Sequence, residues 1–323
     1  MPGEVMFPGL SEIRSAAELI YKSMPATPQY SWPLLNMRTG AEVWVKHENH
    51  TPVGAFKVRG GLVYMDWLRR ERPEVKTVVS ATRGNHGQSI AFAGAQSGIR
   101  VVLVVPFGNS VEKNQAMRAL GAELVEFGSD FQAATEHAVA LAQKHCWHRV
   151  PSFDLRLMTG VATYALEMFS ASPELETVYV PIGMGTGVCG TVAARNAMGL
   201  ATKVVGVVSS RAPATALSYT AGRVVEHEVR TGIADGVACR TPDAAALEMI
   251  KAGVDRIVMV DDEEVKEAMR TYFADTHNVA EGAGAIGLAA LLKDRAAGGD
   301  RVGTVLSGGN VDSDVFAGVL GKS

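Results

Sequence analysis

The chain has 323 residues, 47% of them hydrophobic and 20% charged, which is the composition of a globular protein with a sizeable core. Its net charge of −3 excludes the basic field with which proteins attract nucleic acid or an anionic membrane. No apolar run approaches the roughly 18 residues of a membrane helix, and the early charged residues Glu12 and Arg14 are unlike a secretion signal. Three cysteines without metal-type spacing favour free thiols in a reducing compartment, so we expect a cytoplasmic protein.

The first part of the chain predicts a helix over residues 11–24, because apolar residues there recur at helical spacing. Three prolines between residues 25 and 33 argue against a regular helix in that stretch. A strand is predicted over 41–48, where apolar residues alternate, and a helix over 57–70 follows a turn that contains proline and glycine.

From residue 76 onward, short apolar strands alternate with helical segments. Strands are predicted at 77–80, 100–105, 123–127, 177–182, 203–208, 256–260 and 302–306. Helices are predicted at 85–97, 111–120, 131–144, 160–170, 263–275 and 283–296, with one more ending near 199. Strands separated by helices imply parallel sheets that are covered on both faces. Because the pattern restarts after Pro151, we expect an α/β fold with two open parallel-sheet domains and a cleft between them.

The helix predicted over 57–70 begins with Lys57. The positive partial charge of a helix N-terminus disfavours an ammonium group and favours a neutral amine. A neutral lysine is a nucleophile that can form a Schiff base. A solvated surface lysine at a helix start is the ordinary alternative, and only the other loops of the chain can decide between the two.

The loop between the predicted strand at 77–80 and the helix at 85–97 reads Ala-Thr-Arg-Gly-Asn-His-Gly. Its glycines allow a tight turn and bring backbone amides close to a ligand. The free N–H groups of the helix that starts there favour an anion such as a carboxylate. Thr82 adds a hydroxyl, and Asn85 adds an amide that can donate to a phenolate-type oxygen. An ordinary capped turn is the alternative.

A second loop, Gly-Met-Gly-Thr-Gly at 183–187, follows the strand predicted at 177–182. Its alternate glycines expose successive amides, which suits a phosphate group. Together with Gly190 it also matches the Gly-x-Gly-x-x-Gly fingerprint, so an NADP-binding oxidoreductase is the alternative from another class. That fingerprint needs an acidic residue at the end of the next strand to hold the ribose. The next strand ends Ser-Ser-Arg instead, although Arg211 could serve a 2′-phosphate.

Ser307 follows the last predicted strand and precedes two glycines. Ligands of open α/β sheets lie beyond the carboxyl ends of strands, so we expect its hydroxyl in the same cleft as Lys57 and Asn85. A tight Gly-Gly turn is the simpler alternative. An amine, an anion-binding helix start, a phosphate loop and a hydroxyl are together the parts that a pyridoxal phosphate site requires. An NADP enzyme would leave Lys57 and the Asn85 loop unexplained.

These motifs, in this order and spacing, resemble the fold-type II pyridoxal phosphate enzymes, in particular the threonine/serine dehydratases and serine racemase. Residues 55–60, Ala-Phe-Lys-Val-Arg-Gly, resemble that family's Ser-Phe-Lys-x-Arg-Gly, in which the lysine forms the Schiff base with the cofactor. The resemblance implies a large cofactor-binding domain of residues 1–70 and 152–323. It also implies a small domain of residues 71–151, which carries the loop around Asn85 that we call the asparagine loop. It also implies a small amino-acid substrate and a homo-oligomer, with a dimer as the common case.

The resemblance further implies a role for each motif residue. Lys57 and Ser307 are the implied catalytic residues, Ser307 as the partner of the pyridine nitrogen, and Asn85 would meet the ring oxygen. The implied cofactor-binding residues are Phe56, Lys57, Asn85, Gly183, Met184, Gly185, Thr186, Gly187, Gly236, Glu281 and Ser307. The implied substrate-binding residues are Thr82, Arg83, Gly84 and His86, with Thr82 at the substrate carboxylate and His86 orienting the loop.

The reaction that the resemblance implies is β-elimination from a β-hydroxy-L-amino acid, by default L-threonine or L-serine, to a 2-oxo acid and ammonia. Arg83 stands where serine racemase has its second catalytic serine, which argues against racemisation. An arginine there could instead bind the distal carboxylate of 3-hydroxyaspartate by a bidentate pair. A bulky substrate such as phenylserine is a further alternative.

Two more departures from the family pattern concern the phosphate and a metal. Met184 and Thr186 replace two glycines of the dehydratases' phosphate loop, although Thr186 can donate a hydroxyl in compensation. Residues 209–216 lack the carboxylates with which racemase-like members bind a divalent cation. Hard cations need charged oxygen ligands, so we expect no metal there.

Overall fold

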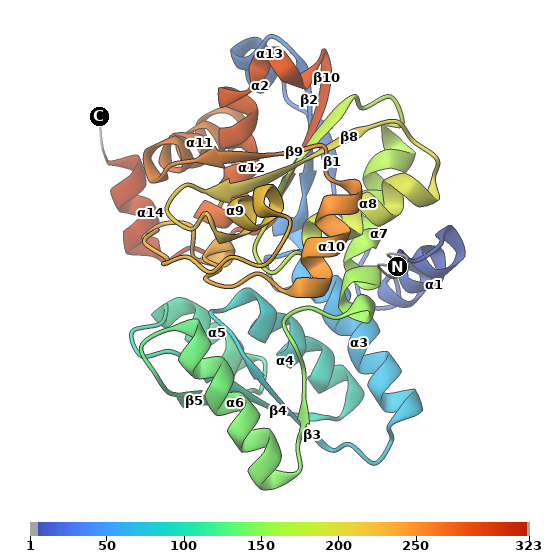
Figure 1. The fold of residues 1–323 in the computed structure, drawn as a ribbon, viewed down its shortest axis with the longest axis vertical. Coiled ribbons are helices and arrows are strands. Elements are labelled where there is room, and N and C mark those ends of the chain that lie inside the picture. Colours follow the sequence, from blue (N-terminus) through green and yellow to red (C-terminus); the bar gives the residue numbers. More distant parts are fainter. Residues whose placement is uncertain (1–5, 322–323) are drawn as a thin grey trace.

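Two parallel sheets organise the chain, and helices cover both of them (Figure 1). The computed structural model describes residues 6–321. The four-stranded sheet lies in the lower half of Figure 1 and the six-stranded sheet in the upper half. The chain enters the four-stranded sheet once, after α3 (Lys57–Glu71), and leaves it before α7 (Leu155–Ala171). The predicted α/β fold with two open parallel sheets is confirmed, whereas the exact domain boundaries stay a prediction.

The six-stranded sheet has the order β1-β2-β10-β7-β8-β9, and all neighbours are parallel except β1 and β2. The central strands β7, β8 and β10 are runs of buried residues, as expected of strands that are covered on both faces. The strands of this sheet are β1 (Gln29–Ser31), β2 (Glu42–His47), β7 (Thr177–Pro181), β8 (Lys203–Ser209), β9 (Arg256–Val260) and β10 (Arg301–Leu306).

The four-stranded sheet has the order β5-β4-β3-β6, with every pair parallel. Alternate residues of β3 and β4 pack toward opposite faces: Val78 and Leu103 join the core with α4, and Val79 and Val104 join the core with α6. Its strands are β3 (Thr77–Ala81), β4 (Arg100–Val105), β5 (Glu123–Glu126) and β6 (His148–Arg149). Its helices are α4 (Asn85–Ser97), α5 (Val111–Ala119) and α6 (Phe131–His145).

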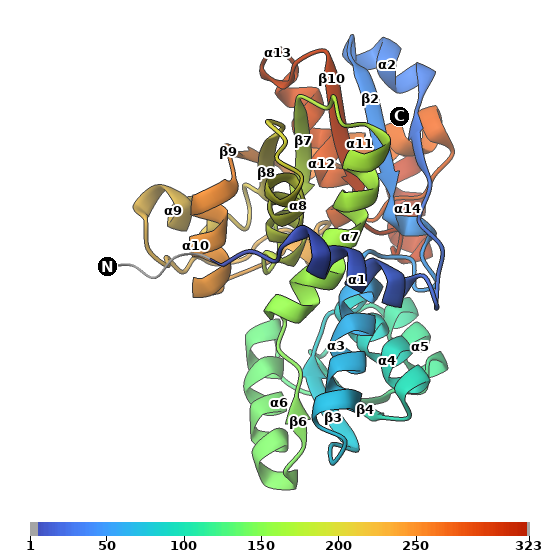
Figure 2. The ribbon, with the colours of Figure 1, turned by 90° about the vertical axis from the view of Figure 1, so that its right-hand side faces the viewer.

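The remaining helices cover the six-stranded sheet. One core lies under α7 and α8, and a second lies under α11 and α12. Figure 2 shows α1 across α7 and α3, which it contacts. These helices are α1 (Leu10–Ile20), α2 (Pro33–Thr39), α8 (Thr186–Ala197), α9 (Ala214–Ala221), α10 (Ala244–Gly253), α11 (Asp262–Thr276), α12 (Gly282–Lys293), α13 (Arg295–Gly298) and α14 (Ser313–Leu320). Two 3₁₀ turns are η1 (Glu48–His50) and η2 (Asp235–Val237).

The close approach of α12 to β10 depends on glycine. A Cβ atom at Gly284 would lie 2.1 Å from the carbonyl oxygen of Gly308, and a Cβ atom at Gly287 would lie 2.7 Å from Thr304 Oγ1. Any side chain at these positions would therefore push the helix away from the strand. The approach lets the backbone N–H of Glu281 donate to Gly308 O at 3.1 Å, which brings the start of α12 next to the end of β10.

A buried group of charges fixes the start of α3, and we call it the scaffold cluster: Arg59, Glu48, Glu167 and Lys46. The Nε atom of Arg59 donates to Glu48 Oε2 at 2.7 Å, and its Nη1 donates to Glu167 Oε1 at 2.7 Å. Lys46 Nζ also donates to Glu167, at 2.6 Å. Arg59 has no exposed side-chain surface, so its charge is stable there only with such partners. The cluster ties α3 to η1, β2 and α7.

Several elements differ from the sequence predictions. The expected absence of helix around the prolines was wrong at Pro33, which is the first residue of α2; proline suits this position because a first-turn N–H has no helical partner. The helix predicted at 160–170 begins earlier, at Leu155, where the Asp154 side chain accepts from the Arg156 N–H. The short strands β1 and β6 and the helices α9, α10 and α14 were not predicted.

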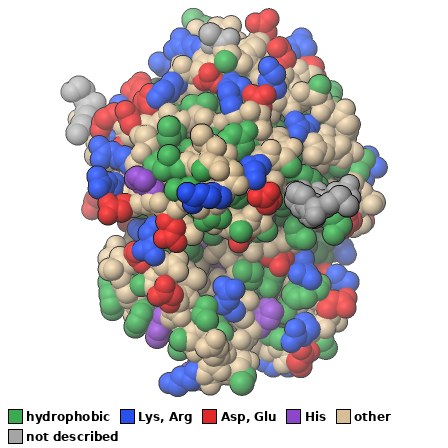
Figure 3. All heavy atoms as spheres, in the orientation of Figure 1, with side chains coloured by type: hydrophobic (Ala, Val, Ile, Leu, Met, Phe, Trp, Pro, Cys, Tyr) green, Lys and Arg blue, Asp and Glu red, His purple; other side chains and the backbone are tan. Residues whose placement is uncertain are grey.

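The surface in Figure 3 carries positive and negative side chains that are interspersed over both halves of the molecule. A single-sign field of the kind that attracts polyanions is not visible on this face. None of the helices in residues 6–321 has both the length and the apolar character needed to cross a bilayer.

Candidate active site

One cavity between the two sheets is lined by all the residues that the sequence assigned to cofactor and substrate. It receives residues from α3, from the loops before α4 and α8, from η2, from the end of β10 and from the start of α12. The assigned residues in its lining are Phe56, Lys57, Thr82, Arg83, Gly84, Asn85, His86, Gly183, Met184, Gly185, Thr186, Gly187, Gly236, Glu281 and Ser307. Their individual roles stay predictions. The lining also contains Lys113, Asp235 and Cys239, which the sequence did not assign.

Lys57 is the first residue of α3, and its amine faces this cavity. Burial lowers the pKa of Lys57 to about 8, and the charge of Glu281 opposes that shift. No group in residues 6–321 hydrogen-bonds Nζ, which lies 5.1 Å from the centre of the Phe56 ring. The Ser89 hydroxyl on α4 donates to the carbonyl oxygen of Lys57 at 2.6 Å and so holds α3 against α4. A substantial fraction of this amine is therefore neutral and nucleophilic near pH 8.

The loop before α4 forms an anion-binding helix start. Gly84 has a φ of +152°, which strongly favours glycine. The Thr82 hydroxyl oxygen accepts from the N–H groups of Gly84 and Gly87, both at 2.9 Å, so its own hydrogen remains available to a ligand. Helix α4 begins at the cavity wall, so its first N–H groups, which have no partner within the helix, can stabilise a carboxylate in the cavity.

The Asn85 amide is oriented from both of its ends. Its Nδ2 donates to Glu281 Oε1 at 2.5 Å, and its Oδ1 accepts from Asn310 Nδ2 at 2.9 Å. One N–H of Nδ2 is left for a ligand in the cavity. The second oxygen of Glu281 accepts from Lys113 Nζ at 3.0 Å. Burial raises the pKa of Glu281, and the charge of Lys113 opposes that shift.

His86 pairs through Nε2 with the Ser80 hydroxyl at 3.1 Å. Burial, with the nearby charge of Lys57, lowers the pKa of His86 to about 3. The imidazole is therefore neutral at pH 7 and cannot act as a proton donor of ordinary strength. This geometry favours the expected role of holding the loop rather than transferring protons.

The glycine loop ends at the N-terminus of α8. Gly185 has a φ of +102°, and a Cβ atom at Gly183 would lie 2.5 Å from the carbonyl oxygen of Gly236. Both positions therefore require glycine for the loop to pack against η2 while its amides face the cavity. Thr186 begins the helix and is buried in the cavity wall. The arrangement provides hydrogen-bond donors and a helix dipole for an anionic group such as a phosphate.

Ser307 lies at the end of β10, and its hydroxyl donates to Ala283 O at 3.2 Å. Its carbonyl oxygen accepts from the Phe56 N–H at 3.0 Å, which joins the strand end to the turn before Lys57. The NADP alternative depends on Arg211, which does not line the cavity. Its Nε atom lies 3.7 Å from Asp262 Oδ2 instead. The described residues contain no group of three or more His, Cys, Asp or Glu side chains that could hold a metal ion.

Comparison with known proteins identifies the family. A family model described as pyridoxal-phosphate dependent enzyme matches residues 22–308. The chain belongs to this family. It is 32% identical to the L-threonine ammonia-lyase of Thermotoga maritima over 97% of this chain and 78% of that protein. It is 30% identical to the catabolic L-threonine dehydratase of Staphylococcus aureus over 96% of this chain and 91% of that protein.

Solved structures agree with the family assignment. The threonine deaminase of T.th. superposes with a TM-score of 0.88 and 30% identity, over 94% of this chain and 99% of that one. Maize serine racemase superposes with a TM-score of 0.89 and 25% identity, over 96% of each chain. The resemblance to fold-type II enzymes is thereby confirmed, and pyridoxal phosphate is the cofactor of this family.

The residues present in the cavity fit that cofactor. Lys57 supplies a partly buried amine with a lowered pKa, and the start of α8 supplies donors for a phosphate. Asn85 supplies one N–H that no other group in the described part of the chain uses, and Ser307 supplies a neutral hydroxyl. These are the four kinds of contact that an aldehyde, a phosphate, a ring oxygen and a ring nitrogen require.

Proposed function

We propose that the protein catalyses β-elimination of water from a β-hydroxy-L-amino acid, with L-threonine or L-serine as substrate, yielding a 2-oxo acid and ammonia. The observation that carries the proposal is the placement of the Lys57 amine, with its lowered pKa, in one cavity with the carboxylate-binding start of α4. The named relatives support the substrate, because they are threonine ammonia-lyases and dehydratases.

The chemistry divides among a few groups of the cavity. Pyridoxal phosphate, when bound, stabilises negative charge that develops on the substrate's α-carbon. The N–H groups of α4 and the Thr82 hydroxyl bind the substrate carboxylate, and Lys57 Nζ removes the α-proton. The β-hydroxyl then leaves as water by taking up the proton that Lys57 Nζ removed. The released enamine hydrolyses in solution to the 2-oxo acid and ammonia.

Two residues favour elimination over other reactions of the same substrate. Ser307 offers a neutral hydroxyl. Unlike an aspartate, it carries no negative charge that would force protonation of the pyridine nitrogen. A bound cofactor would then be a weaker electron sink, which would favour loss of the β-hydroxyl over transamination. Arg83 stands in the α4 loop where a racemase needs an acid on the opposite face, and a guanidinium cannot serve as that acid or base near neutral pH.

The test is an absorbance spectrum of the protein with pyridoxal phosphate, followed by 2-oxo acid formation from L-threonine and L-serine. We expect a visible band from the bound cofactor and a turnover that Lys57→Ala reduces more than about a thousandfold. Lys76→Ala, at an exposed lysine, is the matched control. A protein that binds the cofactor but forms no 2-oxo acid from either amino acid would overturn the proposed reaction.

A second candidate substrate is 3-hydroxyaspartate, and Arg83 favours it. Arg83 lines the cavity, and its Nε is buried without a hydrogen-bond partner in residues 6–321. The two carboxylates of the cavity wall, Asp235 and Glu281, bind Lys113 instead. A partly buried guanidinium without an acidic partner among the described residues suits the distal carboxylate of a substrate.

Relative rates on the two substrates separate these candidates. If Arg83 binds a distal carboxylate, Arg83→Ala lowers kcat/KM for 3-hydroxyaspartate by about 10–100-fold and leaves that for L-threonine nearly unchanged. Arg83→Lys, which keeps a charge but not the bidentate geometry, should lie between the two. An unchanged ratio of the two kcat/KM values in Arg83→Ala would exclude the second candidate.

A further inference from the structure

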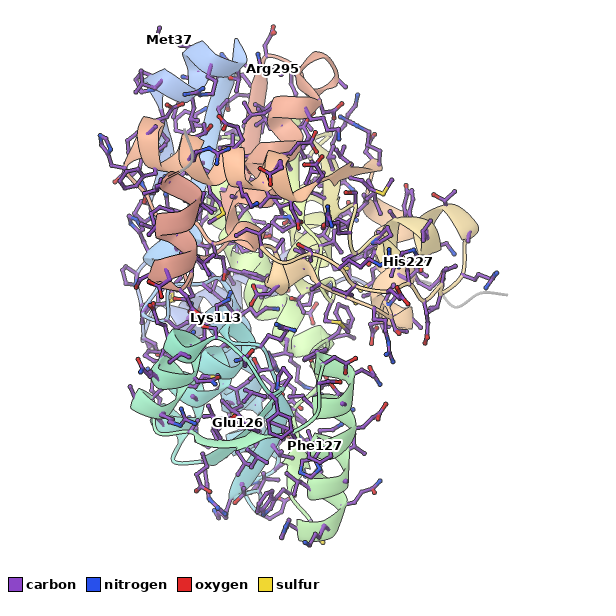
Figure 4. The ribbon with its side chains drawn as sticks, turned by 90° about the vertical axis from the view of Figure 1, so that its left-hand side faces the viewer. Met37, Lys113, Glu126, Phe127, His227 and Arg295 are labelled. Atoms are coloured by element: carbon purple, nitrogen blue, oxygen red, sulfur yellow. The ribbon has the colours of Figure 1, made fainter. Side chains whose placement is uncertain are left out.

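Lys113 connects the two sheets at the cavity. It lies on α5, on the side of the four-stranded sheet, and Figure 4 labels it at the junction of the two halves. Its Nζ donates to Asp235 Oδ2 at 2.9 Å and to Glu281 Oε2 at 3.0 Å. Both carboxylates belong to elements on the side of the six-stranded sheet, η2 and the start of α12. We call Lys113, Asp235 and Glu281 the cavity cluster.

The path of the Lys113 side chain depends on Gly84. A Cβ atom at Gly84 would lie 2.4 Å from Lys113 Cδ, so the stem of the lysine runs directly over the loop that carries Asn85. The Ser110 hydroxyl accepts from the backbone N–H of Lys113 at 3.0 Å and fixes the start of α5 beneath it. The lysine therefore touches the asparagine loop on its way across the cleft.

The charge of Lys113 is matched inside the protein. The residue is only 6% exposed, so its ammonium group needs carboxylate partners in place of water. Burial alone would lower the pKa of Lys113, but Glu281 and Asp235 raise it well above the ordinary value. Lys113 is therefore charged at neutral pH, and it opposes the tendency of buried Glu281 to take up a proton.

Glu281 passes this interaction on to Asn85. Its Oε2 binds Lys113 while its Oε1 accepts from Asn85 Nδ2, so the carboxylate is held at both oxygens. Asn310 fixes the other end of the Asn85 amide. A Glu281 carboxylate displaced from Asn85 would leave the amide held only by Asn310, and the free N–H of Asn85 would be less firmly directed.

We propose that Lys113 is a positioning residue of the cofactor site: by binding Glu281 and Asp235 across the cleft, it holds the Glu281 carboxylate on Asn85 and aims the remaining Asn85 N–H into the cavity. The site is complete only when α5 is docked against η2 and α12. This inference rests on the pyridoxal phosphate site and not on which amino acid is the substrate.

Titration of the cofactor-free protein with pyridoxal phosphate tests the proposal without turnover. Lys113→Met keeps an apolar stem over Gly84 but removes the charge. We expect its Kd for pyridoxal phosphate to rise about 10–100-fold, with a shifted absorbance maximum, because a charged hydrogen-bond link to the ring-oxygen donor is lost. Lys113→Arg, which restores a cation, should recover most of the affinity and the wild-type maximum.

Glu112→Ala is the matched control on the same helix. Glu112 Oε1 accepts from the Ser313 N–H at 2.9 Å, so it also joins α5 to the six-stranded side, but it does not line the cavity. We expect its Kd for pyridoxal phosphate to remain within twofold of the wild-type value. A loss as large as that of Lys113→Met would show that general docking of α5, and not the link through Glu281, supports the site, and would overturn the proposal.

A Glu281→Gln background identifies the route of the effect. If Lys113 acts through Glu281, Lys113→Met should weaken cofactor binding far less in this background than in the wild-type protein. An equal fold-change in both backgrounds would contradict the proposal, as would wild-type affinity and absorbance in Lys113→Met alone.

Circular dichroism verifies folding of each variant. If Lys113→Met does not fold, Glu281→Gln alone must show the weaker binding and the shifted maximum. Absence of threonine turnover in the wild-type protein would leave these binding results unaffected.

Discussion

The scaffold cluster joins two cations to two carboxylates, and the cavity cluster joins one cation to two carboxylates. The two clusters also differ in where those carboxylates lie. Arg59 binds Glu48 through two parallel hydrogen bonds, at 2.7 and 2.9 Å, and none of the scaffold residues lines the cavity. Lys113 instead binds acids on the opposite side of the cavity. A planar guanidinium fixes its partners in one geometry, whereas an ammonium is a compact charge that tolerates movement. We infer that the first cluster serves stability and the second serves the ligand site.

The largest effect is expected at the scaffold cluster. Arg59→Met should lower the free energy of unfolding by about 3–5 kcal/mol, because it leaves the buried Glu48 and Glu167 carboxylates without their main partner. Urea denaturation followed by circular dichroism measures this loss. Arg100→Met, which breaks an exposed pair with Glu123, is the control and should change little. If both substitutions have the same small effect, the assignment of the scaffold cluster to stability is wrong.

Lys57 extends the comparison, because its amine is partly buried and donates to no carboxylate within residues 6–321. Burial lowers its pKa to about 8, from 10.5, so the neutral fraction below pH 8 grows about tenfold for each pH unit. The initial rate of pyridoxal phosphate uptake by the cofactor-free protein should therefore rise with pH and level off above about 8.

Stopped-flow absorbance measures this uptake across the pH series. The same series with a free lysine derivative corrects for the titration of the cofactor itself. A corrected rate that still rises steeply above pH 9 would mean that Lys57 titrates like an ordinary lysine. Burial without a carboxylate partner would then not distinguish Lys57 from Arg59 and Lys113.

The sequence predicted the site residues that depend on local geometry. Lys57, Asn85 and Ser307 each stand at a helix start or a strand end, where their neighbours in the chain already indicate a ligand. The carboxyl ends of parallel strands meet at one edge of a sheet, which is why the sequence predicts that these residues share a cavity.

Lys113 could not be predicted in this way. Its partners Asp235 and Glu281 lie 122 and 168 residues further along the chain, and nothing local to α5 indicates them. Only the docking of the two sheets reveals that the lysine reaches the cavity. Gly84 leaves room for the Lys113 stem, but in the sequence this glycine indicates only a tight turn.

The sequence also did not predict α2, α9 and β1, and in each case the reason lies in the residues of the element itself. Pro33 both ends a proline-rich stretch and begins α2, and the rule that excludes proline from helix interiors does not apply to the first position. Helix α9 contains small and polar residues and lacks a clear apolar stripe. The short strand β1 is recognisable only from its antiparallel pairing with β2.

The smallest effect is expected from Ser307→Asp, which adds an acid to a cavity whose two carboxylates are already bound by Lys113. An aspartate in this place cannot donate to Ala283 O as the serine does, so it should turn toward the pyridine nitrogen and favour its protonation. A stronger electron sink lengthens the life of negative charge at the α-carbon, so transaminated product should rise several-fold relative to 2-oxo acid from elimination. Absorbance of the aminated cofactor, together with a 2-oxo acid assay, measures that ratio. Ser307→Thr keeps a neutral hydroxyl and should keep the wild-type ratio; an equal ratio in all three proteins would show that the neutral partner of the ring nitrogen does not direct the reaction.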